Sequence, residues 1–213
     1  MPEIRTYCQQ ACLWRELMQN TGATRRSRHI NRYPAVNIHH ARRQAERTGV
    51  PLNWMVTINF GVAAVAPEDA SSLLQKLIAR RFAPWLRRSA DNDNGLKPTY
   101  VWSLEAPHGS VSAHVLLHLP PRVIRKFRSR LLDWLEGLAG TAIPARAVDV
   151  RPIYNRVGVT RYILKGINPA WGNHLAVDPV DQGEIVGKRS GFSRNLGPAA
   201  RQRSGYKPKR HLL

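Results

Sequence analysis

The sequence predicts an α+β fold, an antiparallel sheet with helices packed on one face. Two observations support this prediction. Four short segments rich in β-branched and aromatic residues have the composition of strands, and they lie at 54–60, 100–105, 111–119 and 148–154. Apolar residues recur at helical spacing between the first and second of these segments, and again between the third and fourth.

The helices have recognisable ends. The first is predicted to begin at Pro67, where two acidic residues follow at the positive end of the helix dipole, and to stop near Pro84. The second is predicted to begin at Pro120 and Pro121, and a short third helix is expected over 157–166. The order β–α–β–β–α–β–α contains two split βαβ units, which predicts a ferredoxin-like or RRM-like βαββαβ sheet.

Composition divides the chain into three zones. Residues 51–169 carry the strand and helix patterns and are expected to form the packed domain. Residues 1–50 are arginine-rich and are expected to be a basic N-terminal arm with short helices, in which Cys8 and Cys12 are reduced, packed thiols. Residues 170–213 are expected to be a basic C-terminal tail, because glycine and proline interrupt any long element there.

The charge indicates the kind of partner. The chain has 33 Lys and Arg against 14 Asp and Glu, a formal net charge of +19. Such a basic surface attracts a polyanion and releases its counterions, which favours nucleic acid. No apolar stretch approaches the ~20 residues that span a bilayer, and no secretory leader opens the chain. We therefore expect a cytoplasmic protein that does not bind a membrane.

The basic extensions have two interpretations. As solvated tails they would only aid solubility, whereas as DNA-binding arms they would contact phosphates, which a charge of +19 favours. The candidate DNA contacts in these extensions and on the third helix are Arg25, Arg26, Arg161, Lys188, Arg189 and Arg194.

The third strand carries possible metal ligands. Side chains alternate across a strand, so Ser112, His114 and His118 share one face. Glu105 ends the preceding strand just before a short turn, which brings it near position 112. A carboxylate with one or two imidazoles suits Mg²⁺ or Mn²⁺. The alternative is a pair of partly exposed histidines without a metal.

The short third helix carries a possible nucleophile. Tyr162 and Lys165 are three residues apart and lie on one helical face. A cation beside a tyrosine favours loss of the phenolic proton, and phenolate attack on a phosphodiester leaves a covalent phosphotyrosine. Many helical proteins contain a Tyr-x-x-Lys, so this pair alone does not establish an enzyme.

Taken in order along the chain, these segments resemble a known superfamily. They are Val56-Thr-Ile-Asn-Phe60, the glutamate at 105, the strand ending Leu117-His-Leu-Pro120, Tyr-Ile-Leu-Lys-Gly at 162–166, and the tail segment 188–198. Their order and spacing resemble the HUH endonucleases, in particular the rolling-circle replication initiator (Rep) proteins of plasmids and filamentous phages. The resemblance covers residues 53–200.

The resemblance implies a function and roles for individual residues. Tyr162 would be the nucleophile that takes the 5′ phosphate of single-stranded or hairpin DNA, Lys165 would assist at the DNA, and His114 would be the second histidine of the metal-binding pair. Host replication proteins would be further partners. The chain departs from the family pattern at Ser112, where the first histidine is expected. Either Glu105, with His118 or His108, completes the metal site, or the site is degraded.

Three classes of function therefore remain open. The first is a metal-dependent nickase and strand transferase that initiates rolling-circle replication. The second is a basic module that binds DNA or RNA without cutting it, and the third is a ribosomal or RNA-processing protein. Only the first class requires the hydroxyl of Tyr162.

Overall fold

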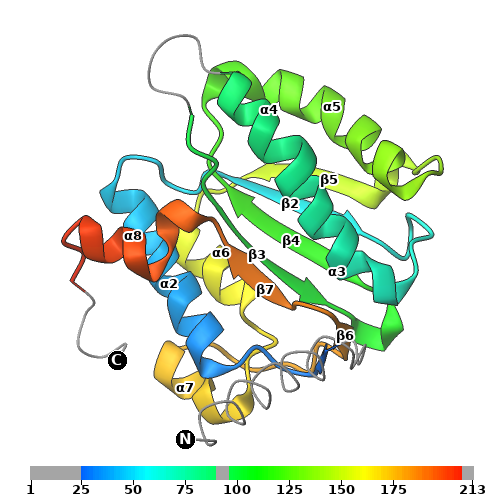
Figure 1. The fold of residues 1–213 in the computed structure, drawn as a ribbon. Coiled ribbons are helices and arrows are strands. Elements are labelled where there is room, and N and C mark those ends of the chain that lie inside the picture. Colours follow the sequence, from blue (N-terminus) through cyan, green and yellow to red (C-terminus); the bar gives the residue numbers. More distant parts are fainter. Residues whose placement is uncertain (1–24, 90–95, 208–213) are drawn as a thin grey trace, which may run out of the picture.

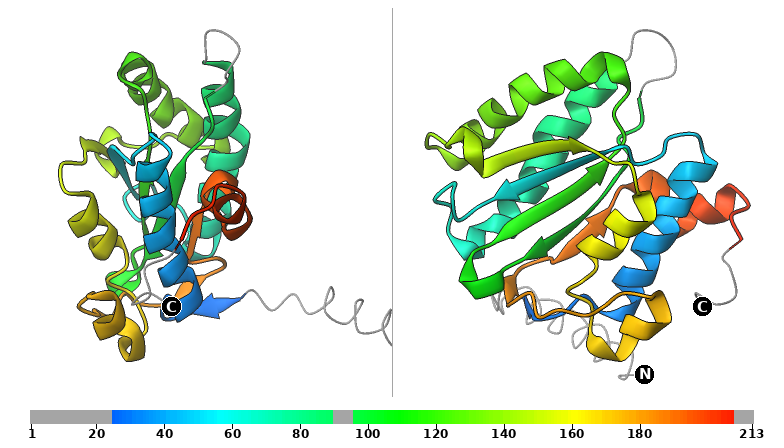
Figure 2. Two further views of the ribbon diagram at one scale, coloured as in Figure 1. Left: turned by 90° about the vertical axis from the view of Figure 1, so that its left-hand side faces the viewer. Right: turned by 180° about the vertical axis from the view of Figure 1, so that it is seen from behind.

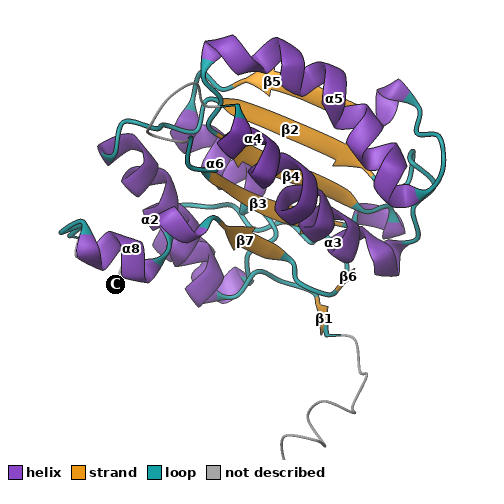
Figure 3. Ribbon diagram, turned by 45° about the horizontal axis from the view of Figure 1, so that its top comes forward, coloured by secondary structure: helices purple, strands orange, loops and turns teal. Residues whose placement is uncertain are grey.

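A computed structural model describes residues 25–89 and 96–207 and shows an α+β protein built on a five-stranded antiparallel sheet (Figure 1). The strand order is β5-β2-β4-β3-β7, and every neighbouring pair is antiparallel (Figure 3). The strands are β2 (Trp54–Asn59), β3 (Tyr100–Glu105), β4 (Ser112–Leu117), β5 (Val148–Pro152) and β7 (Ser190–Phe192).

Four of these strands confirm the segments predicted from composition, with ends that differ by no more than two residues. The fifth, β7, was not predicted, because it is three residues long and contains Gly191. It pairs with the free edge of β3, so part of the expected C-terminal tail belongs to the sheet. A separate two-stranded ribbon joins β1 (Arg26–Ser27) to β6 (Ile185–Val186).

One side of the sheet, which we call the apolar face, packs against the expected helices (Figure 3). Alternate strand residues point to this side and are buried, among them Val56, Ile58, Trp102, Leu104 and Val115. The covering helices are α3 (Pro67–Lys76), the π-helical segment η1 (Leu77–Phe82), α4 (Ala83–Arg88) and α5 (Pro121–Ala139).

The helix that was predicted to end near Pro84 continues to Arg88, because α3, η1 and α4 follow one another without a break. Proline lacks an N–H and its ring clashes with the carbonyl four residues earlier in a regular α-helix. The π-helical turns immediately before it widen the backbone, and the N–H of Ala83 donates to the carbonyl of Ile78, five residues earlier. The wider turns give the proline ring room, so the helix passes through it.

Helices also lie against the other side of the sheet, so the expectation of helices on one face only is wrong. Figure 2 shows α2 (Arg32–Arg47) and α6 (Arg156–Ile163) on the side opposite α3 and α5, near β3 and β7, while β5 and most of β2 remain uncovered there. We call this side the mixed face, because its strand residues include both apolar Val101 and Leu116 and polar Thr57, Ser103 and His114.

The segments expected to be solvated arms supply this second layer. Ile38 of α2 and Leu196 near the C-terminus are fully buried in one cluster with Val101 and Leu116. The guanidinium of Arg201 is buried and donates to the backbone carbonyl and side-chain oxygen of Asn37. The described parts of residues 25–50 and 170–207 are therefore integral to the fold.

The remaining elements are short. They are α7 (Gly172–Leu175), α8 (Pro198–Arg203) and the 3₁₀ turns Pro107–Gly109, Ala145–Ala147, Pro169–Trp171 and Arg194–Leu196. Across residues 25–89 and 96–207, no helix combines the length and the apolarity needed to cross a membrane. The predicted helix with Cys8 and Cys12 lies outside the described residues.

Candidate active site

The ends of β3 and β4 bring a carboxylate and an imidazole together on the mixed face. In the strand register, His114 lies opposite Ser103 on β3 and Thr57 on β2. The Nε2 atom of His114 is 3.0 Å from Glu105 Oε1, and its Nδ1 atom is 3.2 Å from Thr57 Oγ1. The histidine side chain is only 4% exposed, so neighbours on both sides hold the ring in place.

Helix α6 and the turn that follows it place Tyr162 and Lys165 over this pair; the helix ends at Ile163, not at the predicted residue 166, so Lys165 lies in the turn. The helix begins at Asn155, whose side-chain oxygen caps it by accepting from the N–H of Gly158. Its last turn carries Tyr162, whose ring centroid lies 5.1 Å from that of His114 in an edge-to-face arrangement. Tyr162 is 43% exposed, so its ring contacts the site while remaining accessible from solvent.

Lys165 links the helix to the sheet. Its Nζ atom is 2.9 Å from Glu105 Oε2 and 4.2 Å from the centroid of the Tyr162 ring. Glu105 thus lies between an imidazole on one oxygen and an ammonium on the other, with its side chain 13% exposed. Two predicted catalytic residues and two predicted metal ligands therefore meet in one cluster, although they come from three separate elements.

A loop after α7 fixes the backbone on both sides of this cluster. The N–H of Val180 donates to the carbonyl of Lys165 at 2.7 Å, and the N–H of Ala106 donates to the carbonyl of Gln182 at 2.8 Å. The guanidinium of Arg189 anchors the loop, because it donates to the carbonyls of Gln182, Gly183 and Ser27.

Arg189 is therefore not an exposed DNA contact, and that prediction is wrong. The residue is 5% exposed, and burial lowers its pKa to about 10, against the opposing influence of Asp181 and Glu105. Three backbone carbonyls, two in this loop and one on β1, are acceptors for the guanidinium group, which explains why a cation is buried here.

The electrostatics of the cluster keep both charged groups ionised. Burial by itself would raise the pKa of Glu105, but the contacts with His114 and Lys165 outweigh burial and hold the pKa below its usual value. Burial would likewise lower the pKa of Lys165, but Glu105 and Tyr162 outweigh it and raise the pKa. At neutral pH the cluster therefore contains a carboxylate and an ammonium.

The cluster offers two donors to a divalent metal. Nε2 of His114 is buried and makes no hydrogen bond of acceptable geometry, although it lies near Glu105. Within the part of the chain that the structure describes, no group of three or more His, Cys, Asp or Glu could hold a metal ion. One imidazole and one carboxylate fit Mg²⁺ or Mn²⁺ if the ion takes its other ligands from water and substrate.

The other histidines considered from the sequence lie elsewhere. His118 follows β4 at the end opposite Glu105, and its Nδ1 atom is 2.7 Å from the carbonyl oxygen of Pro51. Four residues of strand separate it from His114, roughly 13 Å, which is too far for a shared ion. His108 lies in the exposed turn after β3, in a left-handed backbone conformation.

The remaining predicted DNA contacts are exposed but differ in their surroundings. Arg161 precedes Tyr162 on α6, and Lys188 lies 5.7 Å above the ring of Trp102. Arg26 makes an exposed ion pair with Glu184 at 2.7 Å, which reduces the charge it offers to DNA. Arg25 and Arg194 lie at the surface, near the ribbon and after β7.

Sequence reasoning missed Thr57 as a neighbour of His114. A threonine in a strand is an ordinary β-forming residue, so only the β2–β4 register indicates its contact with the imidazole. A hydroxyl at Nδ1 fixes the ring orientation and leaves Nε2 directed at Glu105, an arrangement that commonly orients metal-binding histidines.

Comparisons with known proteins found no match: no family model, no curated protein and no solved structure is similar to this chain at a significant level.

Proposed function

We propose that this protein nicks single-stranded DNA through Tyr162 and transfers the strand, which initiates rolling-circle replication. The observation that supports the proposal is the meeting of Tyr162 and Lys165 with Glu105 and His114 over one end of the sheet. A nucleophile, a cation and two metal-type donors within one cluster are the groups that such a reaction requires.

The proposed fold is ferredoxin-like, with β7 as an added edge strand. Numbered by their order in the predicted βαββαβ unit, β2, β3, β4 and β5 lie in the order 4-1-3-2. Two interleaved split βαβ units produce this order, with both crossover helices on one face. In this fold the mixed face is opposite the crossover helices, and the candidate catalytic groups Glu105 and His114 lie there, on β3 and β4.

In the proposed reaction, the Tyr162 oxygen attacks the scissile phosphorus and the bond from phosphorus to the 3′ oxygen breaks. The phenolic proton passes to solvent, and the leaving 3′ oxygen takes up a proton from solvent. Lys165 offsets negative charge that develops near the tyrosine oxygen, because its ammonium lies against the same ring. A divalent ion bound by His114 and Glu105 would polarise the scissile phosphate.

The uncovered part of the mixed face, over β2 and β5, is the route that we propose for single-stranded or hairpin DNA (Figure 2). It borders α6, where exposed Arg161 lies beside Tyr162. Lys188, Arg194, Arg25 and Arg26 would contact phosphates farther from the nick. In the cytoplasm, host replication proteins would then extend the released 3′ end.

A non-catalytic DNA- or RNA-binding module is the second candidate. The observation that favours it is that both oxygens of Glu105 already face partners, His114 and Lys165, while Ser112 occupies the position of the missing histidine. A carboxylate paired in this way has less charge to offer a metal. The same surface would then bind nucleic acid without cutting it.

The test is incubation with labelled circular and hairpin single-stranded DNA, in Mn²⁺ or in EDTA, followed by denaturing electrophoresis. We expect a metal-dependent nick with protein attached to the 5′ end. Tyr162→Phe should abolish both the nicked strand and the covalent protein–DNA adduct. It removes only one oxygen, so the affinity for DNA should stay within about twofold of that of the wild type. Tyr154→Phe is the matched control, because Tyr154 is 91% exposed and lies between β5 and α6, away from the cluster of Glu105 and His114.

Two outcomes would contradict the nickase. Tight binding with no nick in any metal would support the non-catalytic module instead. Equal cleavage by the wild type and by Tyr162→Phe would mean that another group attacks the phosphate.

A further inference from the structure

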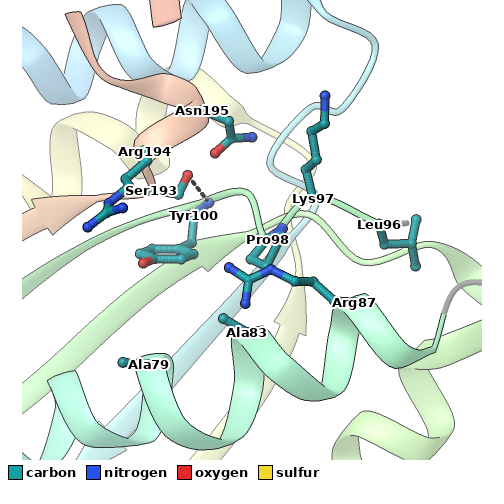
Figure 4. Close-up of a pocket in the computed structure, with 10 residues that line it drawn as sticks. All are labelled: Ala79, Ala83, Arg87, Leu96, Lys97, Pro98, Tyr100, Ser193, Arg194 and Asn195. Atoms are coloured by element: carbon teal, nitrogen blue, oxygen red, sulfur yellow. Dashed lines mark hydrogen bonds between the residues drawn. The ribbon is translucent and has the colours of Figure 1, made fainter. Parts of the chain in front are cut away.

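A basic pocket lies away from the Tyr162 cluster, between α4, the start of β3 and the turn after β7 (Figure 4). Its volume is about 550 Å³. Three cationic side chains line it, Arg87, Lys97 and Arg194, and all three residues are exposed. Among the described residues that line the pocket, none is acidic. The pocket therefore presents a concentrated positive charge to solvent.

The pocket is separate from the candidate active site. Tyr100 lies in the pocket at the first position of β3, and Glu105 lies in the active site at the last. Five residues of strand separate them by roughly 16 Å. Alternation also directs Tyr100 to the apolar face and Glu105 to the mixed face. One ligand group cannot contact both sites.

The inner wall of the pocket contains an acceptor without a donor. The hydroxyl of Thr99 donates to the carbonyl of Lys97 at 2.9 Å, so it can only accept from the side-chain amide of Asn195, at 2.7 Å. This arrangement fixes the orientation of the amide. The Oδ1 atom of Asn195 is left buried with no hydrogen-bond partner. A buried acceptor of this kind is stabilised by a ligand that carries an N–H or O–H group.

The pocket also offers apolar surface and a neutral phenol. Ala79, Ala83, Leu96 and Pro98 form part of the lining beside the ring of Tyr100. Burial raises the pKa of Tyr100, although Arg87 and Arg194 act in the opposite direction. The phenol is therefore protonated at neutral pH and can donate to an anion that the two guanidinium groups attract.

We propose that this pocket binds a nucleotide. Arg87, Arg194 and Lys97 would contact its phosphate, the ring of Tyr100 and the apolar wall would contact its nucleoside part, and Asn195 Oδ1 would accept from an amino or hydroxyl group. A free nucleoside triphosphate and a nucleotide unit of a single strand share this chemistry. The proposal does not depend on the Tyr162 reaction.

The test measures binding of ATP, inorganic phosphate and a 12-nucleotide single strand by titration calorimetry. All proteins carry Tyr162→Phe, so that a strand cannot be cut during the titration. Arg87→Gln with Arg194→Gln removes two pocket charges. Arg130→Gln with Arg146→Gln is the matched control, because it removes the same charge from exposed residues that do not line the pocket. Thermal unfolding of each variant checks that it is folded.

We expect Arg87→Gln with Arg194→Gln to weaken nucleotide binding at least about tenfold, and Arg130→Gln with Arg146→Gln to weaken it less than about twofold. A direct contact between a guanidinium group and a phosphate contributes more to affinity than the long-range attraction of a distant surface charge. A loss confined to ATP identifies a free nucleotide as the ligand, and a loss confined to the oligonucleotide identifies a strand. Asn195→Ala should weaken ATP or oligonucleotide binding but leave phosphate binding unchanged.

Equal effects of the two pairs on every ligand would overturn the proposal, because only the net charge would then matter. It would also fail if inorganic phosphate bound as tightly as ATP and the oligonucleotide were unaffected by the pocket pair. If the wild-type protein shows no nicking in the separate cleavage assay while the pocket pair loses nucleotide binding in this titration, only the nickase proposal fails.

Discussion

The two faces of the sheet differ in what they bury. The apolar face meets its helices through hydrophobic side chains, with Phe82, Trp85, Phe127 and Trp134 in mutual ring contact. The mixed face buries hydrophobic residues at one end of β3 and β4, and His114 and Ser103 toward the other. Some of its buried polar groups have specific partners, such as Arg189, whereas Nε2 of His39 and Nε2 of His114 are buried without a hydrogen bond.

This difference shows how the fold separates stability from chemistry. Hydrophobic packing on one face needs only shape and volume, whereas a buried polar group is stable only when a partner satisfies it. The mixed face contains the candidate active site, the buried Arg189 and the buried histidines of α2. We therefore expect substitutions on the two faces to have different consequences.

The largest effect is expected for Phe127→Ala. Phe127 is 2% exposed on the apolar face, so its removal leaves a cavity and should lower the free energy of unfolding by about 3–5 kcal/mol. Tyr162→Ala, on the mixed face, should cost less than about 1 kcal/mol, because an exposed ring loses little on truncation. Urea denaturation measures both, and similar losses would remove the distinction between the faces.

The next effect is expected for Arg189→Met. The change removes the guanidinium donor from the carbonyls of Ser27 and Gly183 and leaves the Gln182 carbonyl with the N–H of Ala106 alone, which should lower the free energy of unfolding by about 2–3 kcal/mol. Lys188→Met, at the exposed neighbour, should stay within about 0.5 kcal/mol. If Arg189→Met also stays within that range in urea denaturation, the guanidinium does not anchor the loop.

A third effect concerns pH. Burial first, then nearby arginines and His40, lower the pKa of His39 from 6.5 to about 4. The unfolded chain takes up a proton near pH 6.5 while the folded protein does not, so stability present above this pH is lost as the pH falls. Burial first, then Arg201 and Arg43, also lower the pKa of His40 to about 4, so we expect each of the two histidines to contribute a loss of about 2 kcal/mol between pH 6.5 and 4.5.

Urea denaturation across this range measures the loss, and His39→Gln should remove about half of it, because His40 still contributes. Glu105 does not interfere, because its lowered pKa removes stability only as the pH falls below the ordinary value of 4.5. A profile for His39→Gln as steep as that of the wild type would assign the loss to other groups.

The smallest effect is expected for Ser112→His. Residue 112 lies directly opposite Glu105, so an imidazole there adds a third donor beside His114. Binding of Mn²⁺ should tighten about tenfold, or about 1.4 kcal/mol. Ser110→His, in the turn before β4, is the control and should bind as the wild type does. Titration calorimetry measures the affinity for Mn²⁺. If Ser112→His binds Mn²⁺ no more tightly than the wild type, the cluster does not bind metal through these residues.

Much of the fold was predictable from local pattern, and α2 shows why the rest was not. Its buried positions include Ala35, Ile38, Ala41 and Ala45, together with polar His39. Alanines give a weak hydrophobic signal, and a spacing of three or four residues among small side chains does not distinguish a buried helix from a solvated one. The segment 32–47 was therefore predicted to be part of a solvated basic arm, although it forms a helix whose inner side is buried.

The candidate site was predictable only in its parts. Strand alternation placed His114 on one face, and the spacing of Tyr162 and Lys165 placed them on one side of a helix. The 2.9 Å contact between Lys165 and Glu105 depends on how α6 lies over β3, which local sequence does not encode. Arg189 was misassigned for the same reason, since its burial depends on the loop that surrounds it.

The sequence by itself determined four of the five strands of the main sheet, the helices α3, α5 and α6, the net charge of +19 and the residue types available for chemistry, because these follow from local preference and composition. The tertiary structure decided which strand edge β7 completes, which face α2 covers, and that Tyr162 lies 5.1 Å from His114. Those features depend on contacts between residues far apart in the chain, and such contacts form only when the whole fold satisfies its buried groups at once.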